Sequence, residues 1–449
     1  MRSKMRAASM AAGALCLALS ASACSGAGGG SAAGDQNSIN VLMVNNPQME
    51  DLQRLTADNF TKDTGIKVNY TVLPENDVRA KISQEFSSQA GQYDVASLSN
   101  YEIPFYSENK WLAPLDNVAE DAEFNQADIL PAYTESLTGK DGKLYGEPFY
   151  GESSFLMYRK DIFEAKSLTM PEKPTWDQVA DLAAKADGAA PGMKGICLRG
   201  QPGWGQVFAP LTTVVNTFGG TWFDKDWNAK VNAPEFKEAT EFYTKLVREH
   251  GEAGAAQAGF TECLNNMSQS KVAMWYDATS AAGALEAASS PVKGKIGYAQ
   301  APVKNTKSSG WLWTWSWGVQ AASKKQDAAG KFIAWASSKK YEELVASKLG
   351  WAKVPSGKRI STYENAEFQK AAPFFKAERA AIENADPKNP GVQERPVVGI
   401  QFVGIPEFAD LGTTVSQGVS SAIAGQGSVE DALAKGQDAA QKIGDKYKK

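Results

Sequence analysis

The sequence of 449 residues contains a single histidine, His250. Histidine is the side chain best suited to acid–base catalysis near neutral pH and a frequent zinc ligand, so its scarcity argues against both kinds of site. The sequence also lacks a P-loop, a GxGxxG fingerprint and internal repeats. A formal net charge of -4 gives no indication of a nucleic-acid partner. We therefore expect neither a metal nor a cofactor.

Long hydrophobic runs are also scarce, and the one near the N-terminus has the pattern of a targeting segment. Residues 7–19 form an apolar run after three basic residues, too short for the roughly 20 residues that span a bilayer. Small residues and then Cys24 follow, which resembles a bacterial lipoprotein signal. We expect residues 1–23 to be a signal peptide, Cys24 to carry the lipid and residues 24–38 to form a flexible tether. The alternative is ordinary cleavage after Ala23.

Cysteine is rare as well, with four residues in the whole chain. Cys16 belongs to the signal peptide and Cys24 to the expected lipid anchor, so Cys197 and Cys263 remain as a pair. The medium outside the membrane is oxidising, and a disulfide between them is therefore predicted. The alternative is two unrelated buried thiols.

Three apolar segments of strand length, residues 39–44, 66–73 and 93–98, alternate with two segments of helical periodicity. This order predicts a parallel sheet with helices on both faces, and thus an α/β protein. Ligands of such sheets bind at the carboxyl ends of the strands. The polar residues expected at those ends include Asn46, Asn100 and Tyr101.

The chain is organised around residues 143–165, which join its two halves. The pattern predicts a strand over 143–150, a polar break over 151–154 and a second strand over 155–158. Gly151 allows a sharp change of backbone direction in the break. Tyr150, Glu152 and the two serines after them suit a polyhydroxylated ligand better than a core, so we expect them on the floor of a wet cleft.

Three segments, FTKDTGIKV (60–68), KVAMWYDAT (271–279) and SVEDALAKGQDAAQKI (428–443), resemble the family 1 extracellular solute-binding proteins of ABC importers. The maltodextrin-binding proteins are familiar members, and the resemblance covers residues 38–445. It implies an α/β fold of two lobes with a cleft between them, joined by crossing segments. It also implies a lipid-anchored, monomeric protein on the extracellular face, which binds a ligand without turnover and delivers it to a permease.

Longer segments are similar to a branch of this family that takes up the polyols sorbitol and mannitol. They are YGESS (150–154), CLRGQPGWG (197–205), TVVNTFGGTWF (213–223), DATSAAG (277–283) and WLWTWSW (311–317). A polyol is therefore the implied ligand. Two alternatives remain open: a mono- or oligosaccharide bound for uptake or sensing, and a secreted glycosidase that uses Glu152 and Asp277.

The expected lobe boundaries follow from the order of these elements. The first lobe should contain residues 39–152 and the second residues 153–312. Residues 313–355 should return to the first lobe, and residues 356–449 should supply mainly helices of the second lobe.

A Pro-Gly turn that follows a predicted strand presents the residues with the clearest expected roles. Trp204 should stack on the carbon chain of the ligand, and Arg199 should direct its planar fork at two hydroxyls. The alternatives are a packed tryptophan and a surface ion pair. Asp277 could accept hydrogen bonds from the ligand or cap the helix after it.

Four tryptophans alternate over residues 311–317 and should share one face of a strand. We expect the outer two to pack and Trp313 or Trp315 to reach the cleft, whereas Trp275 could lie in the core or the cleft. The predicted ligand-binding residues are Asn46, Asn100, Tyr101, Tyr150, Glu152, Arg199, Trp204, Trp275, Asp277, Trp313 and Trp315.

Overall fold

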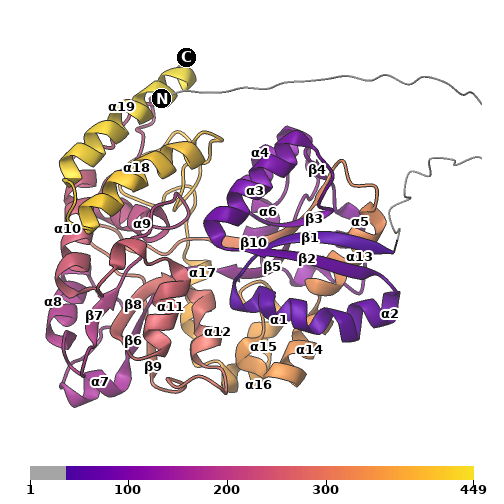
Figure 1. The fold of residues 1–449 in the computed structure, drawn as a ribbon, viewed down its shortest axis with the longest axis horizontal. Coiled ribbons are helices and arrows are strands. Elements are labelled where there is room, and N and C mark those ends of the chain that lie inside the picture. Colours follow the sequence, from indigo (N-terminus) through magenta and orange to yellow (C-terminus); the bar gives the residue numbers. More distant parts are fainter. Residues whose placement is uncertain (1–36, 449) are drawn as a thin grey trace, which may run out of the picture. The chain divides into compact units, whose positions relative to one another are not determined.

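The computed structural model describes residues 37–448, so the expectations for the signal peptide and Cys24 lie outside the described residues. Residues Asn37–Lys449 cluster into one compact unit. Its strands form two separate sheets with helices around each (Figure 1). The first strand already begins at Ser38, so the expected tether of residues 24–38 overlaps the fold at its last residue. No helix in this part of the chain has both the length and the apolar character needed to cross a bilayer.

The first sheet has the strand order β2-β1-β3-β10-β4, and β5 also pairs with β10. Strands β1, β2 and β3 are parallel, as the alternation of segments predicted. Strand β10 runs antiparallel to β3 and β5, so the sheet is mixed. The strands are β1 (Ser38–Val44), β2 (Lys67–Leu73), β3 (Val95–Ser99), β4 (Leu112–Ala113), β5 (Glu147–Glu152) and β10 (Trp313–Gln320).

Helices cover both faces of this sheet, because the strand order 2-1-3 sends successive right-handed crossovers to opposite sides (Figure 1). One continuous helix, α1 (Pro47–Thr56) to α2 (Lys62–Thr64), includes a π-helical turn and ends at Gly65, whose φ is 73°. The other helices before β5 are α3 (Glu75–Ser88), α4 (Glu102–Glu108), α5 (Asp116–Ala119) and α6 (Pro131–Ser136).

The second sheet has the order β7-β8-β6-β9, in which β7 and β8 are parallel and β6 is antiparallel to its neighbours. Its strands are β6 (Ser154–Arg159), β7 (Lys194–Cys197), β8 (Val272–Ala278) and β9 (Ile296–Gln300). The helices of this part before β10 are α7 (Lys160–Ala165), α8 (Trp176–Ala186), α9 (Phe208–Phe218), α10 (Pro234–His250), α11 (Phe260–Ser268) and α12 (Ala282–Leu285). Every residue of α9 is buried, and the sequence pattern did not reveal this helix.

Ser153 alone separates β5 in the first sheet from β6 in the second. The predicted break over residues 151–154 is therefore wrong, because Gly151 and Glu152 continue β5 and pair with β10. A Cβ atom on Gly151 would lie 2.4 Å from the Tyr133 ring, so the glycine permits close approach rather than a turn. The chain crosses again between β9 and β10, and that segment includes Trp311.

The C-terminal third divides between the two sheets. Helices α18 and α19 pack on α10, and α17 packs on β6 and β9. Arg359, by contrast, forms a β-bridge with Ile129, which precedes α6. Ser428 caps α19 as predicted, by accepting a hydrogen bond from the Asp431 backbone. These helices are α13 (Gln326–Ala336), α14 (Lys339–Leu349), α15 (Ile360–Glu364), α16 (Ala366–Ala371), α17 (Phe375–Glu383), α18 (Phe408–Ile423) and α19 (Val429–Tyr447).

Candidate functional site

A cavity lies where the two lobes meet, and its walls lie close together: the space free of protein atoms, including the open mouth, is about 360 Å³, of which about 20 Å³ can hold the centre of a water molecule. That is room for about one water molecule, so the walls must part to admit a larger ligand. Charged, amide and hydroxyl groups line it together with aromatic rings. The lining residues are Asn46, Glu75, Arg79, Glu152, Arg199, Gly205, Ala209, Phe260, Ala278, Ser280, Trp311, Trp313, Trp315, Gln401 and Phe402.

The first lobe contributes Asn46, Glu75 and Arg79 from the carboxyl ends of its strands. Asn46 caps α1 directly after β1, and Glu75 opens α3 directly after β2. One helical turn later, the Arg79 guanidinium donates to Glu75 Oε1 at 2.8 Å and to Glu102 Oε1 at 2.9 Å. It also lies over the Trp315 ring, 4.8 Å from its centroid. Arg79 thus enters the cavity wall already paired and packed.

The second lobe contributes Arg199, which follows β7. Its guanidinium donates to both carboxylate oxygens of Asp277, at 2.8 and 2.6 Å, and to the Gly205 carbonyl at 3.0 Å. Burial alone would lower the pKa of Arg199, but the carboxylates of Asp277, Glu75 and Glu152 outweigh it and raise that pKa. The planar fork is therefore occupied by Asp277 rather than free for two ligand hydroxyls.

Direct contacts between the lobes close the cavity. Gln206 donates to Glu75 Oε2 at 3.2 Å, and Arg199 Nη1 lies 3.7 Å from the same oxygen. On another side, Gln48 donates to the Ser280 carbonyl at 2.9 Å. The two lobes are therefore held together, and a closed cavity lies between them rather than an open cleft.

Glu152 lies at the crossing between the sheets and is 6% exposed. Its carboxylate accepts a hydrogen bond from the Ser280 hydroxyl. Burial raises the pKa of Glu152 to about 8, against the opposing effects of Ser280 and Arg199. Near neutral pH the carboxyl group can therefore act as a hydrogen-bond donor as well as an acceptor.

Five aromatic rings form the apolar part of the lining. Trp313 and Trp315 lie on β10, with ring centroids 6.0 Å apart, and Phe402 packs edge-on against Trp313 at 5.3 Å. Trp311 precedes the strand and also lines the cavity, although its sequence position predicted a packing role. Trp317 packs on Phe149 in the core.

Of the predicted binding residues, five line the cavity: Asn46, Glu152, Arg199, Trp313 and Trp315. Tyr150 lies directly behind Asn46 and accepts its amide hydrogen at 2.7 Å. Asp277 is fully buried, and besides Arg199 it accepts from the Trp275 indole at 3.0 Å. Neither Asp277 nor Trp275 is part of the lining.

The other three predicted residues also lie outside the lining. Asn100 accepts from the Thr314 backbone at 3.2 Å, and Tyr101 donates to the Ile405 carbonyl at 2.8 Å. Trp204 is 8% exposed, packs between Tyr101 and Phe402, and lies under Arg79. The expected loop tip is thus part of the interlobe packing.

Sequence reasoning missed several lining residues, and some of them carried a signal. Glu75 and Arg79 begin the helix after a predicted strand, where ligands of α/β sheets bind. Phe260 lies at the start of α11. Gln401 and Phe402 belong to an apolar segment in a long irregular loop, which is an unusual composition for solvent-exposed chain.

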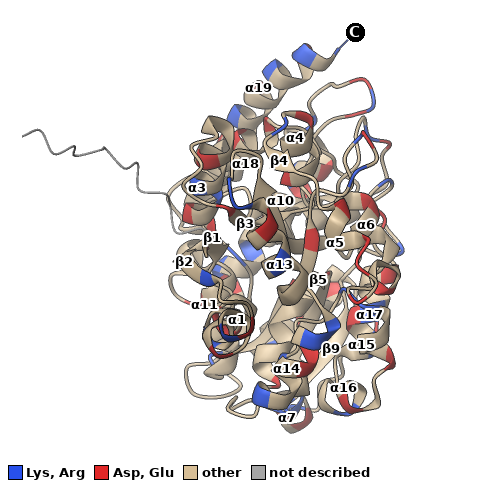
Figure 2. Ribbon diagram, turned by 90° about the vertical axis from the view of Figure 1, so that its right-hand side faces the viewer, with Lys and Arg blue, Asp and Glu red and all other residues tan. Residues whose placement is uncertain are grey.

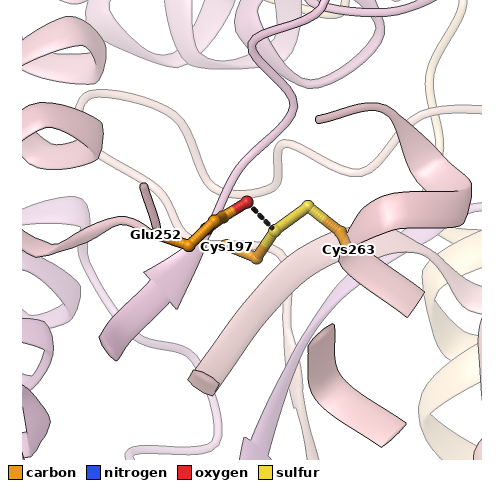
Figure 3. A group of neighbouring side chains, drawn as sticks. All are labelled: Cys197, Glu252 and Cys263. Carbon is orange, nitrogen blue, oxygen red and sulfur yellow. Dashed lines mark hydrogen bonds between the residues drawn. A yellow bond between two sulfur atoms is a disulfide. The ribbon is translucent and has the colours of Figure 1, made fainter. Parts of the chain in front are cut away.

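Cys197 at the end of β7 and Cys263 in α11 form a disulfide (Figure 3). Glu252 Oε1 lies 3.1 Å from Cys197 Sγ. Among residues 37–448, these three form the group of acidic and sulfur side chains whose ligand atoms all lie within 4.8 Å of one another. Because thiolates are the form of cysteine that binds metals, the oxidised pair does not offer a metal site.

Comparison with known proteins places this geometry in a family. Residues 45–343 match the model of the bacterial extracellular solute-binding proteins. A mannitol-binding protein of Pseudomonas aeruginosa is 38% identical over 401 residues, which cover 89% of this chain and 91% of the relative. The chain therefore belongs to the bacterial extracellular solute-binding protein family, as its motifs indicated.

One solved structure and a further relative support the same assignment. A solute-binding protein from Agrobacterium vitis with bound D-mannitol has a TM-score of 0.89 and 44% identity, and the match covers 91% of this chain and 99% of that one. An erythritol/L-threitol-binding protein of Mycolicibacterium smegmatis is 26% identical over 325 residues, 68% of this chain and 67% of the relative. The predicted two-lobed α/β fold is confirmed, and the relatives named here are binding proteins.

Proposed function

We propose that this protein captures an acyclic polyol, with mannitol and sorbitol as the first candidates, and delivers it to the permease of an ABC importer. The observation that carries the proposal is the lining of the interlobe cavity, in which side chains from both lobes combine carboxyl groups, guanidinium groups and tryptophan rings. The bound D-mannitol of the Agrobacterium vitis protein and the name of the Pseudomonas aeruginosa relative support the same ligand class.

The chemistry of the lining suits a polyol because each hydroxyl both donates and accepts. Glu75 can accept hydrogen bonds, Asn46 and Gln401 can do both, and the tryptophan rings offer apolar faces to the carbon chain. Closure of two lobes requires contacts that the ligand makes only in the closed form. Side chains from both lobes in one lining meet that requirement.

A mono- or oligosaccharide is the second candidate ligand class. The interlobe contacts of Gln48 and Gln206 close the cavity at two sides, which favours a single small molecule over an oligosaccharide that would need a longer groove. Capture for sensing rather than uptake would use the same lining.

Catalysis by Glu152 and Asp277 is not part of the proposal. A glycosidase requires both carboxyl groups beside the scissile bond. Asp277 is fully buried and neutralised by the bidentate pair with Arg199, and it does not reach the cavity.

Anchoring completes the proposal. Residues 1–23 would be removed, Cys24 would carry lipid, and the tether would hold a monomer at the extracellular face of the membrane. The lobes would divide at residues 152/153, with residues 313–355 in the first lobe. Cys24→Ala should release the protein into the medium, and retention of this variant in the membrane fraction would contradict the anchor.

Calorimetric titration of the purified protein against mannitol, sorbitol, erythritol, glucose and maltose tests the ligand class. We expect the hexitols to bind most tightly, with no change in their chemical structure after incubation. If no polyol binds, the proposed ligand class is wrong. Cleavage or oxidation of a ligand by the pure protein would instead indicate an enzyme.

A further inference from the structure

Residues 384–407, between α17 and α18, contain no helix or strand. Irregular segments longer than about 15 residues are uncommon in compact domains unless they have a function. Residues 395–402 of this loop, which we name the strap, end at the cavity, where Gln401 and Phe402 form part of the lining. The strap is therefore a wall of the site that comes from outside both sheets.

Gln401 is the strap residue that lines the cavity with a side-chain amide free of protein partners among the described residues. It is 4% exposed, yet its side-chain amide makes no hydrogen bond with any other residue in the described part of the chain. A primary amide has two donor hydrogens and an accepting oxygen, and neither amide atom of Gln401 is among the fully buried atoms without a partner, so both remain accessible from the cavity. A ligand hydroxyl in the cavity could satisfy both kinds of group.

A buried asparagine in α9 fixes the backbone just before Gln401. Asn216 is 1% exposed and donates from Nδ2 to the Ile400 carbonyl at 3.0 Å. Its Oδ1 accepts from the Arg395 guanidinium, which also donates to the Gly399 carbonyl at 3.2 Å. Two side chains thus hold two consecutive carbonyls of the strap.

Arg395 makes these contacts without a carboxylate partner among residues 37–448. Its acceptors are one amide oxygen and one carbonyl, and its Nε has no partner. Burial lowers the pKa of Arg395 to about 10. A partly desolvated cation that is held by neutral groups costs stability, so a role in placing the strap accounts for it better than a role in stabilising the fold.

The strap backbone is also tightly constrained. Gly399 has a φ of 139°, and a Cβ atom there would lie 2.2 Å from the Phe402 carbonyl. After this turn, the Phe402 ring packs on Trp313 and Trp204. The position of Gln401 is therefore determined on both sides.

We propose that Gln401 is a specificity-determining contact for one ligand hydroxyl, and that Asn216 and Arg395 are positioning residues that hold it at the cavity. This inference rests on the proposed function and adds to it the residue that reads the hydroxyl pattern. Asn216 lies within residues 213–223, none of which lines the cavity.

Binding of D-mannitol and its monodeoxy analogues to wild type and Gln401→Leu tests the contact. Because D-mannitol has two-fold symmetry, the analogues that lack the C1, C2 or C3 hydroxyl cover every position. We expect Gln401→Leu to weaken mannitol binding about ten- to hundredfold. The analogue that lacks the contacted hydroxyl should bind wild type with a similarly reduced affinity. Its affinity for Gln401→Leu should then be the same as for wild type.

Asn216→Asp and Arg395→Lys test the positioning. Asn216→Asp keeps the contact with Arg395 but removes the donor to the Ile400 carbonyl. We expect both variants to discriminate less between mannitol and the analogue that lacks the contacted hydroxyl. The ratio of the two Kd values measures this, and a general loss of stability would not change it. Val392→Ser is the matched control, because Val392 lies in the same loop, is 59% exposed and is not part of the lining.

The outcomes separate the two proposals. If wild type binds mannitol and Gln401→Leu binds mannitol and all analogues equally well, the strap inference is wrong while the proposed function stands. If Gln401→Leu discriminates less but Asn216→Asp and Arg395→Lys match wild type, the positioning role is wrong. If wild type binds no polyol, both the proposed function and the inference built on it are overturned.

Discussion

At the scale of single residues, Glu152 has a carboxyl group that the fold makes difficult to ionise. Its pKa is raised from 4.5 to about 8 by burial, so the folded state holds a proton that the unfolded chain releases. The free energy of unfolding should therefore fall as pH rises from about 4.5 to 8, and this contribution should be constant above that range. We expect Glu152→Gln to weaken this dependence by about 1–4 kcal/mol between pH 5 and 9.

Urea denaturation of ligand-free protein across this pH range measures the effect. Glu238→Gln is a suitable control, because Glu238 is exposed on α10 and should leave the profile of the wild type unchanged. Identical profiles for Glu152→Gln and wild type would show that Glu152 does not titrate in this range.

The buried ion pair between Arg199 and Asp277 gives a second prediction. Asp277→Asn removes the charge that compensates a guanidinium of 6% side-chain exposure. Loss of one partner of a buried pair typically costs about 3–5 kcal/mol of stability. Asp177→Asn should cost under about 1 kcal/mol, because Asp177 pairs with Lys304 at 65% exposure. Comparable urea midpoints for the two variants would contradict the prediction.

Trp204 gives a third prediction, which reverses the expectation from sequence. A loop-tip tryptophan would affect affinity and leave stability unchanged. The structure packs the Trp204 ring against Tyr101 and Phe402, so Trp204→Ala should lower stability by about 3–5 kcal/mol. Thermal melts without ligand check this. An unchanged melting temperature would contradict the packing role and favour stacking of Trp204 on the ligand.

At the scale of elements, the disulfide joins β7 to α11 across 66 residues of sequence. Closing a loop of that length removes unfolded-state entropy worth about 4 kcal/mol. The double variant Cys197→Ala, Cys263→Ala should melt well below wild type. Melting of wild type with and without a thiol reductant provides the control, since reductant should lower the melting temperature of wild type alone.

Local signals predicted many elements before the structure was known. Residues 39–44 and 66–73 were apolar runs of strand length, and Ser428 followed three residues later by Asp431 marked a helix start. The antiparallel insertion of β10 beside β3 was not predictable, because 213 residues lie between Ser99 at the end of β3 and Trp313 at the start of β10, and pairing depends on tertiary packing. Helix α9 is apolar on all sides, so it lacked the periodicity that identifies surface helices.

The site was predictable where chemistry coincides with a strand end. Asn46 and Arg199 were found in this way, and both line the cavity. The partner of Arg199 could not be inferred, because Asp277 lies 78 residues away in sequence and only the folded sheet brings β7 beside β8. The apolar residues around Gln401 indicated a covered loop, but nothing in the sequence places that loop over the cavity.

At the scale of the whole molecule, acidic and basic residues are interspersed over the face shown in Figure 2. Neither sign of charge is therefore concentrated in one region of that face. Capture of an uncharged polyol needs no long-range steering by charge. Salt should therefore have little effect on the association rate, in contrast to a receptor for an anionic solute.

Ligand binding should stabilise the whole described unit, because the lining takes residues from both lobes. With mannitol at a thousand times its Kd, the free energy of unfolding should rise by about 4 kcal/mol. The urea midpoint should shift in one cooperative transition. Two separate transitions, with one insensitive to mannitol, would show that a lobe contributes nothing to binding.

The crossing at Ser153 has a mechanical consequence. Glu152 pairs with Trp313 in the first sheet, and one residue beyond Ser153 the Ser154 hydroxyl accepts from the Trp311 backbone at 3.3 Å. Two adjacent segments that cross between the lobes side by side hinder sliding of one lobe past the other. They still allow the lobes to rotate about the line of the crossing. During such a rotation Glu152 and Trp313 would hardly move relative to each other, whereas Arg79 and Arg199 would separate. A polyol would thus dock first beside Glu152 and Trp313 at the axis. Arg79 and Arg199 would then approach each other as the lobes close around it.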